Sequence, residues 1–171
     1  MFLRIKRLKR ISKAPAYVEN TELVLPPDTN HHGTVFGGRV LQWIDITAAI
    51  TAQRFAGHKV VTASIDQMHF ILPIELGHVV ILKACVNCVH ETSMEIGVRV
   101  EREDASTGII DHAATAYLTF VAMDDAMKPV TVPHLLLETA TERRRVADAH
   151  LRRESRLKHR KALLARRQRG E

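Results

Sequence analysis

The chain has 171 residues, 46% of them hydrophobic and 26% charged, and its formal net charge at pH 7 is +6. This size and composition are those of one globular domain with extensions, and no apolar run is long enough to span a bilayer. Two cysteines, and no apolar block of the kind that follows the basic start of an export signal, favour a reduced, cytoplasmic setting.

The positive charge is concentrated at the two ends of the chain. Residues 1–16 contain six Lys/Arg and no acid, and residues 138–171 contain twelve Lys/Arg against five acids. The body between them, residues 17–137, has seven bases and fourteen acids and is therefore net −7. We divide the chain accordingly into a basic N-terminal arm, one domain and a basic C-terminal helix. Overall basicity is thus weak evidence for nucleic acid as a partner.

The arm places Phe2, Ile5, Leu8 and Ile11 at three-residue spacing among Lys and Arg. This pattern predicts an amphipathic basic segment. It fits a solvated or partner-packed extension, and membrane-surface association or organelle targeting remain alternatives.

A short strand is predicted over Thr21–Leu25, where Pro26 and Pro27 end it. A glycine-bearing loop, residues 28–38, then leads into a helix over 39–56 that Gly57 closes. Four strand-like runs follow, at Val60–Leu72, Val79–Val89, Thr92–Glu103 and Ile109–Met123. One buried helix followed by consecutive long strands predicts an α+β fold, with an antiparallel sheet wrapped around the helix.

From Glu138 the sequence is rich in Leu, Ala, Arg, Lys and Glu and has no Gly or Pro until Gly170. This predicts a helix with a wide polar face and few apolar positions. Two interpretations stay open: a solvated helix packed on its own oligomer, or a surface for nucleic acid or another anionic partner.

Asp45 is the single acid in the apolar run of the first helix, with small or apolar residues (Leu41, Ala48, Ala49 and Ala52) at helical offsets from it. A carboxylate in such surroundings is costly unless it is hydrogen-bonded or used in chemistry. It is either a structural acid or a group tuned to accept a proton from water.

Gly37 and Gly38 stand just before this helix and leave its first amides open to a ligand. Free amides at the positive end of a helix can receive an anion or an oxyanion developing on a carbonyl. The sequence has no phosphate-binding P-loop, no dinucleotide-binding glycine pattern and no serine-hydrolase elbow.

The spacing of the histidines and cysteines does not predict a metal site. His31 and His32 are adjacent in the loop and no third His or Cys has zinc-site spacing, so we expect His32 to shape the loop or line a pocket mouth. Cys85 and Cys88 lie three apart in a predicted strand, which would point them to opposite faces. We expect them to be small apolar fillers.

Taken together, four segments resemble the acyl-coenzyme A thioesterases of the hotdog fold, in particular the cytosolic and brain-type acyl-CoA hydrolases. They are residues 27–38 (PDTNHHGTVFGG) with Asp45 beyond them, 61–74 (VTASIDQMHFILPI), 90–95 (HETSME), and 120–124 (FVAMD) with Lys128-Pro129. The similarity spans roughly residues 20–133 and leaves both tails unmatched.

The resemblance implies that Asn30 and Asp45 are the catalytic residues and that Asn30 of one subunit serves Asp45 of the other. It implies a homodimer assembled into a homohexamer, with acyl-CoA as substrate and neither metal nor organic cofactor. Asp45 would be general base or nucleophile, Gly37 and Gly38 the oxyanion donors, and Asn30 the group that positions water or carbonyl.

The phosphates of CoA need cations or hydroxyl donors, for which we select Thr92, Ser93, Arg99 and Lys128. Two other functions remain as alternatives. One is an acyl-CoA binding or sensing module that does not hydrolyse its ligand. The other, least favoured, is a nucleic-acid-binding protein that uses its two basic tails through phosphate contacts alone.

Overall fold

Helix α1 (Gly37–Ala56) is apolar on so much of its surface that it needs cover on more than one side. Val40, Ile44, Ala48 and Ala52 recur at helical spacing and are completely buried. The helix ends at Gly57, whose φ of 70° makes a left-handed cap. In this computed structural model the described residues run from 12 to 169.

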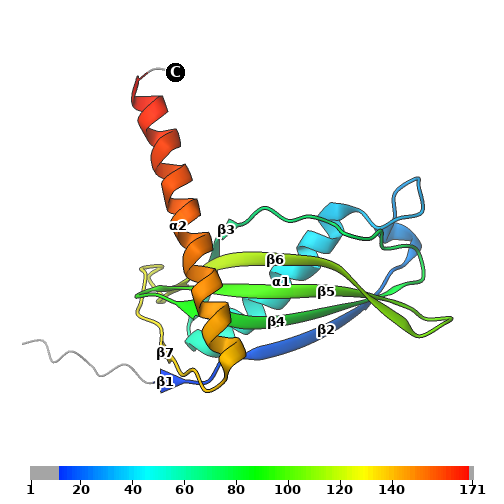
Figure 1. The fold of residues 1–171 in the computed structure, drawn as a ribbon, viewed down its shortest axis with the longest axis horizontal. Helices are drawn as coiled ribbons and strands as arrows, with labels where there is room; N and C mark the ends of the chain where they lie inside the picture. The colour runs from blue at the N-terminus through cyan, green and yellow to red at the C-terminus, as the bar shows by residue number, and fades with distance from the viewer. Residues whose placement is uncertain (1–11, 170–171) are drawn as a thin grey trace, which may run out of the picture. The chain divides into compact units, whose positions relative to one another are not determined.

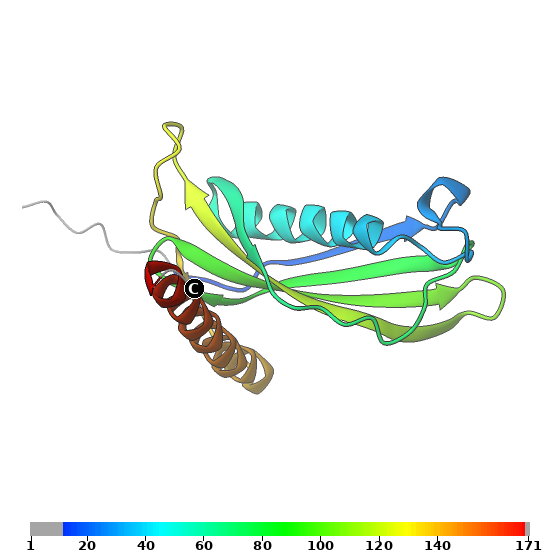
Figure 2. The ribbon, with the colours of Figure 1, turned by 90° about the horizontal axis from the view of Figure 1, so that it is seen from above.

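A five-stranded antiparallel sheet supplies the cover. Its strands are β2 (Tyr17–Leu23), β3 (Lys59–Ile65), β4 (Val79–Val89), β5 (Ser93–Asp104) and β6 (Ile109–Met123), in the order β2-β4-β5-β6-β3. Alternate residues of β4, β5 and β6 are fully buried against α1, which lies along one face of the sheet (Figures 1 and 2). The predicted α+β arrangement is confirmed.

The second predicted strand is shorter than expected, because it leaves the sheet after Ile65 instead of continuing to Leu72. A β-bulge between Thr62 and Ser64 shifts its register on β6, and the chain returns to β6 only at an isolated bridge between Phe70 and Ala114. The first strand lies earlier than predicted, at Tyr17–Leu23, and ends before Leu25.

Three short elements escaped prediction because segments of two or three residues carry no periodic signal. β1 (Ser12–Lys13) pairs in parallel with β7 (His134–Leu135), and a 3-10 turn covers Pro26–Asp28. Apart from residues 12–16, the predicted N-terminal arm lies outside the described residues.

The chain forms two compact units, Met1–Leu136 and Leu137–Glu171. The second contains helix α2 (Ala140–Arg169), which begins two residues after the predicted start at Glu138. None of the described helices has a segment both long and apolar enough to cross a membrane.

The prediction for the two cysteines is wrong about their direction. A β-bulge in β4 places Cys85 opposite Gly97 and Cys88 opposite Glu95. Because Gly97 and Glu95 are two residues apart on β5, both cysteines lie on the same sheet face, the one away from α1. The Cys85 thiol donates to Asn87 Oδ1 at 3.4 Å, and both cysteines are buried and form no disulfide within the described residues.

Gly97 makes room for a buried polar contact on this face. Asn87 Nδ2 donates to Glu95 Oε1 at 3.2 Å, and a Cβ added to Gly97 would lie 2.5 Å from the same Nδ2. We therefore expect Gly97→Ala to displace Asn87 and to lower the free energy of unfolding by about 1–3 kcal/mol. Urea denaturation followed by the fluorescence of buried Trp43 measures this change.

The matched control is Gly38→Ala, because no atom lies within 4 Å of a Cβ added there. Alanine in a helix is favoured over glycine by about 1 kcal/mol, so this variant should be as stable as the parent or more so. Equal stability of the parent and Gly97→Ala would contradict the role given to Gly97.

Candidate active site

The first turn of α1 offers two unused hydrogen-bond donors. Phe36, in an extended conformation, is the N-cap, and its carbonyl accepts from the N–H groups of Arg39 and Val40. The N–H groups of Gly37 and Gly38 have no acceptor among the described residues. Amides left free at the positive end of a helix can hold a negative charge.

Asp28 ties the preceding loop to this turn. Its buried carboxylate accepts from the Leu25 N–H at 3.0 Å and forms a 2.8 Å ion pair with Arg39 Nε. The Asp28 carbonyl also accepts from the Phe36 N–H at 2.9 Å. One acid thus fixes both ends of the loop relative to the helix start.

Asn30 organises the tip of the same loop. Its Oδ1 accepts from the His32 N–H at 2.9 Å, and its Nδ2 donates to Thr34 Oγ1 at 2.9 Å. Gly33 supplies the left-handed residue that the tight turn needs, with φ of 78°. Since a side-chain amide has two N–H groups, one remains available to a ligand.

A pocket of about 390 Å³ adjoins the helix start. The ring of Phe70 lies over Gly37, where a Cβ would meet it at 3.5 Å, and is 47% exposed. The pocket is mostly apolar; its lining residues are Thr34, Val35, Gly37, Phe70, Ile71, Leu72, Pro73 and Ile74. Such a wall suits an apolar group bound beside the free amides.

Asp45 is half-buried on the side of α1 that faces β3. Its Oδ1 accepts a hydrogen bond from Thr62 Oγ1 at 2.9 Å, and its Oδ2 has no partner among the residues that the structure describes. Thr62 therefore fixes the carboxylate while one oxygen stays free to accept a proton.

The two parts of this site are separated within one chain. Asp45 follows Gly37 by eight residues on a continuous helix, which corresponds to about 12 Å along its axis. Asn30 precedes the helix and belongs to the Gly37 end. Asp45, by contrast, lies beside β3, an edge strand that pairs only with β6.

The four residues selected for CoA phosphates do not gather in one place. Thr92 and Ser93 are at the start of β5, where the Thr92 carbonyl accepts from the Ala122 N–H. Lys128 follows β6 at the same end of the sheet, in a turn where its N–H donates to Asp124 Oδ1. Arg99 lies six residues farther along β5, roughly 20 Å from Ser93.

Arg99 is also already engaged. Its Nε lies 2.6 Å from Glu101 Oε1, and Lys83 Nζ lies 2.7 Å from Oε2 of the same carboxylate. Burial acts to raise the pKa of Glu101, but the hydrogen bonds from Arg99 and Lys83 hold it below its ordinary value. The shared acid offsets one of the two positive charges and leaves this cluster with a net charge of +1.

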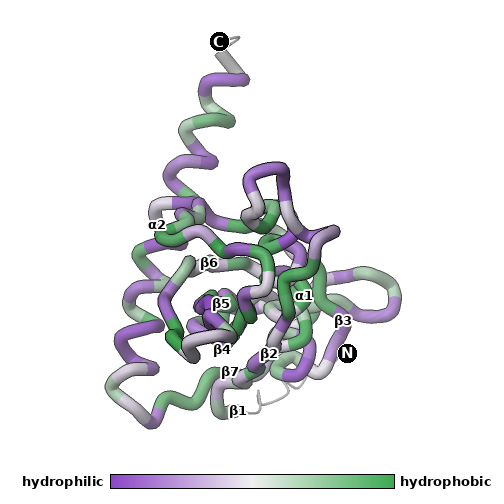
Figure 3. The backbone as a smooth tube through the Cα atoms, turned by 90° about the vertical axis from the view of Figure 1, so that its right-hand side faces the viewer, coloured by the Kyte–Doolittle hydropathy of each residue, from purple (hydrophilic) through white to green (hydrophobic). Residues whose placement is uncertain are grey.

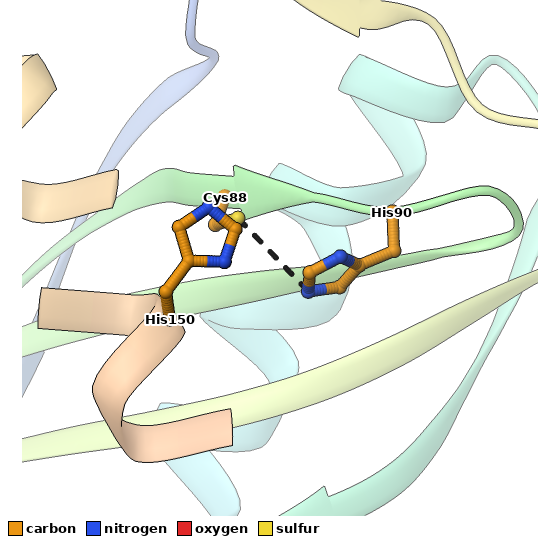
Figure 4. A group of neighbouring side chains, drawn as sticks. All are labelled: Cys88, His90 and His150. Atoms are coloured by element: carbon orange, nitrogen blue, oxygen red, sulfur yellow. Dashed lines mark hydrogen bonds between the residues drawn. The ribbon is translucent and has the colours of Figure 1, made fainter. Parts of the chain in front are cut away.

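His31 and His32 are in contact at the loop tip, with ring centroids 3.7 Å apart, ring planes tilted by 46° and both residues exposed. On the sheet face away from α1, Cys88 Sγ lies 4.0 Å from His90 Nε2 (Figure 4). Within the described part of the first unit, no third His, Cys or acid joins this pair.

Sequence reasoning missed two residues of the candidate site, Thr62 and Phe70. Both stand in the 61–74 segment that carries the family resemblance, so a hydroxyl and an aromatic in that segment were the available signals. Their roles depend on contacts with α1, which come from elsewhere in the chain.

Comparison with known proteins gives a consistent set of relatives. Residues 32–109 match the family model of the thioesterase superfamily. A Bacillus subtilis protein named as an uncharacterised acyl-CoA thioester hydrolase is 44% identical over 125 residues, which are 73% of each chain. Mouse acyl-coenzyme A thioesterase 11 is 37% identical over 142 residues, but the chain spans only 24% of its length.

Solved structures that resemble this chain are also acyl-CoA hydrolases or thioesterases. An acyl-CoA hydrolase of Staphylococcus aureus, in complex with butyryl-CoA and CoA, has a TM-score of 0.79 and 41% identity, covering 84% of this chain and 88% of that one. Structures of that enzyme with an asparagine, an aspartate or a threonine replaced by alanine also match. A hexameric acyl-CoA thioesterase has a TM-score of 0.84 and 41% identity, with coverage of 87% and 97%.

Proposed function

The chain belongs to the thioesterase superfamily, and from that membership we propose that it hydrolyses acyl-CoA to a free acid and coenzyme A. Its sheet wrapped around one helix is the hotdog fold. The observation that carries the proposal is the carboxylate of Asp45, held by Thr62 with one oxygen free, in a chain whose Gly37 and Gly38 amides are also free.

In the proposed reaction the thioester carbonyl oxygen accepts from the amides of Gly37 and Gly38. Asp45 removes a proton from water, whose oxygen attacks the carbonyl carbon. The C–S bond then breaks, and the leaving thiolate takes that proton from Asp45 and departs as the CoA thiol. A direct attack by Asp45 through a mixed anhydride is the alternative route. Asn30 positions the water or the carbonyl with its remaining amide N–H.

The spacing of the altered residues in the Staphylococcus aureus enzyme supports these assignments. Its asparagine and aspartate are 15 residues apart, and its threonine follows 17 residues later. Asn30, Asp45 and Thr62 have the same two separations. Thr62 therefore joins the proposed site as the residue that positions Asp45.

We propose that a second copy of the chain completes each site, within a hexamer like that of the relative. The 12 Å between Asp45 and the start of its own helix supports this arrangement. So do the exposed apolar side chains near Asp45, since Ile46 and Ile65 are 48% and 45% exposed. Two cysteines that form no disulfide within the described residues fit a reduced compartment, and the cytoplasm is our proposed location.

A panel of acyl-CoAs of different chain length and branching, with a thiol reagent to detect released CoA, tests the activity. We expect thiol release from at least one member of the panel. Tight binding of acyl-CoA without release would instead favour the binding module, and neither binding nor release would refute both functions.

Thr62→Val should remove the hydrogen bond to Asp45 while keeping the side-chain volume. A hydrogen bond to a charged group is worth about 1.5–3 kcal/mol, so we expect kcat to fall about 10–100-fold with little change in KM. Thr62→Ser should recover most of the activity because it restores the hydroxyl. Equally low kcat values for Thr62→Ser and Thr62→Val would contradict the role given to the hydrogen bond between Thr62 and Asp45.

A further inference from the structure

Helix α2 is the part of the chain that the proposed hydrolysis does not use. It contains twelve Lys/Arg and three acids in 30 residues. The ion pair between Arg144 and Asp148 lies in its first half. Six cations, from Arg153 onward, have no hydrogen bond or ion pair with any residue that the structure describes: Arg153, Lys158, Arg160, Lys161, Arg166 and Arg167. This chain therefore leaves their positive charge uncompensated.

Five of these cations occupy two sides of the helix, and Arg166 lies on a third side, about 220° around the axis from Arg153. At 100° per residue, Arg153, Arg160 and Arg167 follow one another at seven-residue intervals along one flank. Lys158 and Lys161 lie roughly 130° around the axis from that flank. A partner with a single flat acidic surface would reach only one of the two rows.

A lipid surface does not fit this helix. Leu151, Leu157, Leu163 and Leu164 are all at least 44% exposed, but only Leu157 and Leu164 lie on the same side of the axis. Figure 3 shows hydrophobic and hydrophilic residues alternating along α2. A helix that binds a membrane surface needs one apolar face to bury among the lipids.

Single-stranded nucleic acid does not fit either, because residues 138–171 contain no aromatic side chain on which bases could stack. The deep, narrow major groove of duplex RNA excludes a helix. By contrast, the B-DNA major groove is about 12 Å wide and matches the diameter of an α-helix. It also presents a row of phosphates on each side.

We propose that the second half of α2 is a docking surface for double-stranded DNA. The helix lies in the major groove, and its two rows of cations contact the phosphates of the two strands. Arg153 and Arg167 are 14 residues apart, about 21 Å along the helix. The contacts are with phosphates and not with base edges, so binding is independent of DNA sequence.

The test uses the full chain and a labelled, mixed-sequence DNA duplex of about two helical turns, with binding followed by fluorescence anisotropy. Each phosphate contact contributes about −0.9 to the slope of log K against log salt, so the five cations of the two rows give about −4.5. Affinity should therefore fall about 10³-fold between roughly 50 and 200 mM salt. Affinity that varies less than tenfold over this range would overturn the proposal.

The variant Arg160→Gln/Lys161→Gln/Arg167→Gln removes three of the five charges in the two rows and keeps helix propensity. We expect the slope to shrink to about −2 while thioester hydrolysis is unchanged. Lys6→Gln/Arg7→Gln/Lys9→Gln is the matched control, because it removes three charges from the other basic tail. A loss of slope in the control and not in the α2 variant would place the DNA contacts in the arm and overturn the proposal.

Competition separates DNA from other polyanions. Duplex RNA, polyglutamate and phosphatidylserine vesicles, each added at equal charge, should displace the labelled DNA at least tenfold less effectively than unlabelled DNA. Equal displacement by any of them would assign α2 to that partner, or to charge alone, and would overturn the proposed groove.

Discussion

Asp45→Asn should leave a folded protein with almost no thioesterase activity. The substitution keeps the size of the side chain and its hydrogen bond from Thr62, but an amide cannot accept the proton of water. Loss of a general base costs about 10²–10⁴-fold, so we expect kcat to fall by about that factor while KM stays within a few-fold. Steady-state hydrolysis with the best acyl-CoA of the panel gives both constants.

The matched control is Asp125→Asn, because the Asp125 side chain is 99% exposed and pairs only with Lys59. Its activity should be within about twofold of the parent, since surface ion pairs contribute little. An Asp45→Asn variant that keeps more than a tenth of the activity would remove Asp45 from the chemistry. Mass spectrometry after acid quench separates the two routes, because only a nucleophile leaves an acyl group on Asp45.

Mixing two inactive variants should restore activity if each site is shared between subunits. Asn30→Ala and Asp45→Asn should each form nearly inactive oligomers. In a dimer of one subunit of each kind, one site carries both lesions and the other carries neither. Random pairing should therefore recover about a quarter of the parent activity.

Co-expression with two different affinity tags isolates the mixed oligomers, so that their formation is shown independently of activity. If Asn30 and Asp45 of one chain instead served the same site, every site of a mixed dimer would carry one lesion. Inactive mixed oligomers would thus refute the shared site while leaving thioesterase activity itself intact.

The sequence by itself determined the fold class and the principal candidates. The apolar period of residues 39–56 requires a helix covered by a sheet, whatever the details of that sheet. Asp45 stands out because a lone acid in an apolar helix needs a reason, and Gly37 and Gly38 because they open the first turn. All three are local signals, which can be recognised within a few residues of the sequence.

Only the tertiary structure decided which residues meet. Thr62 reaches Asp45 across 17 residues, through the packing of β3 on α1, and no local pattern marks that contact. The bulge in β4 reversed the direction expected for Cys88, because one extra residue shifts every later side chain by one position. β3 also ended earlier than its sequence pattern, at Ile65, and Phe70 in the segment beyond it lies beside Gly37.

For the charged residues, too, the sequence determined one part and the tertiary structure the other. Counting residues located the basic ends of the chain but could not tell which cations were already neutralised. In the structure Arg99 shares Glu101 with Lys83, whereas the second half of α2 keeps six cations without partners among the described residues. Ion pairing depends on distances of a few ångströms between residues on different strands, and that is the information which one-dimensional sequence does not contain.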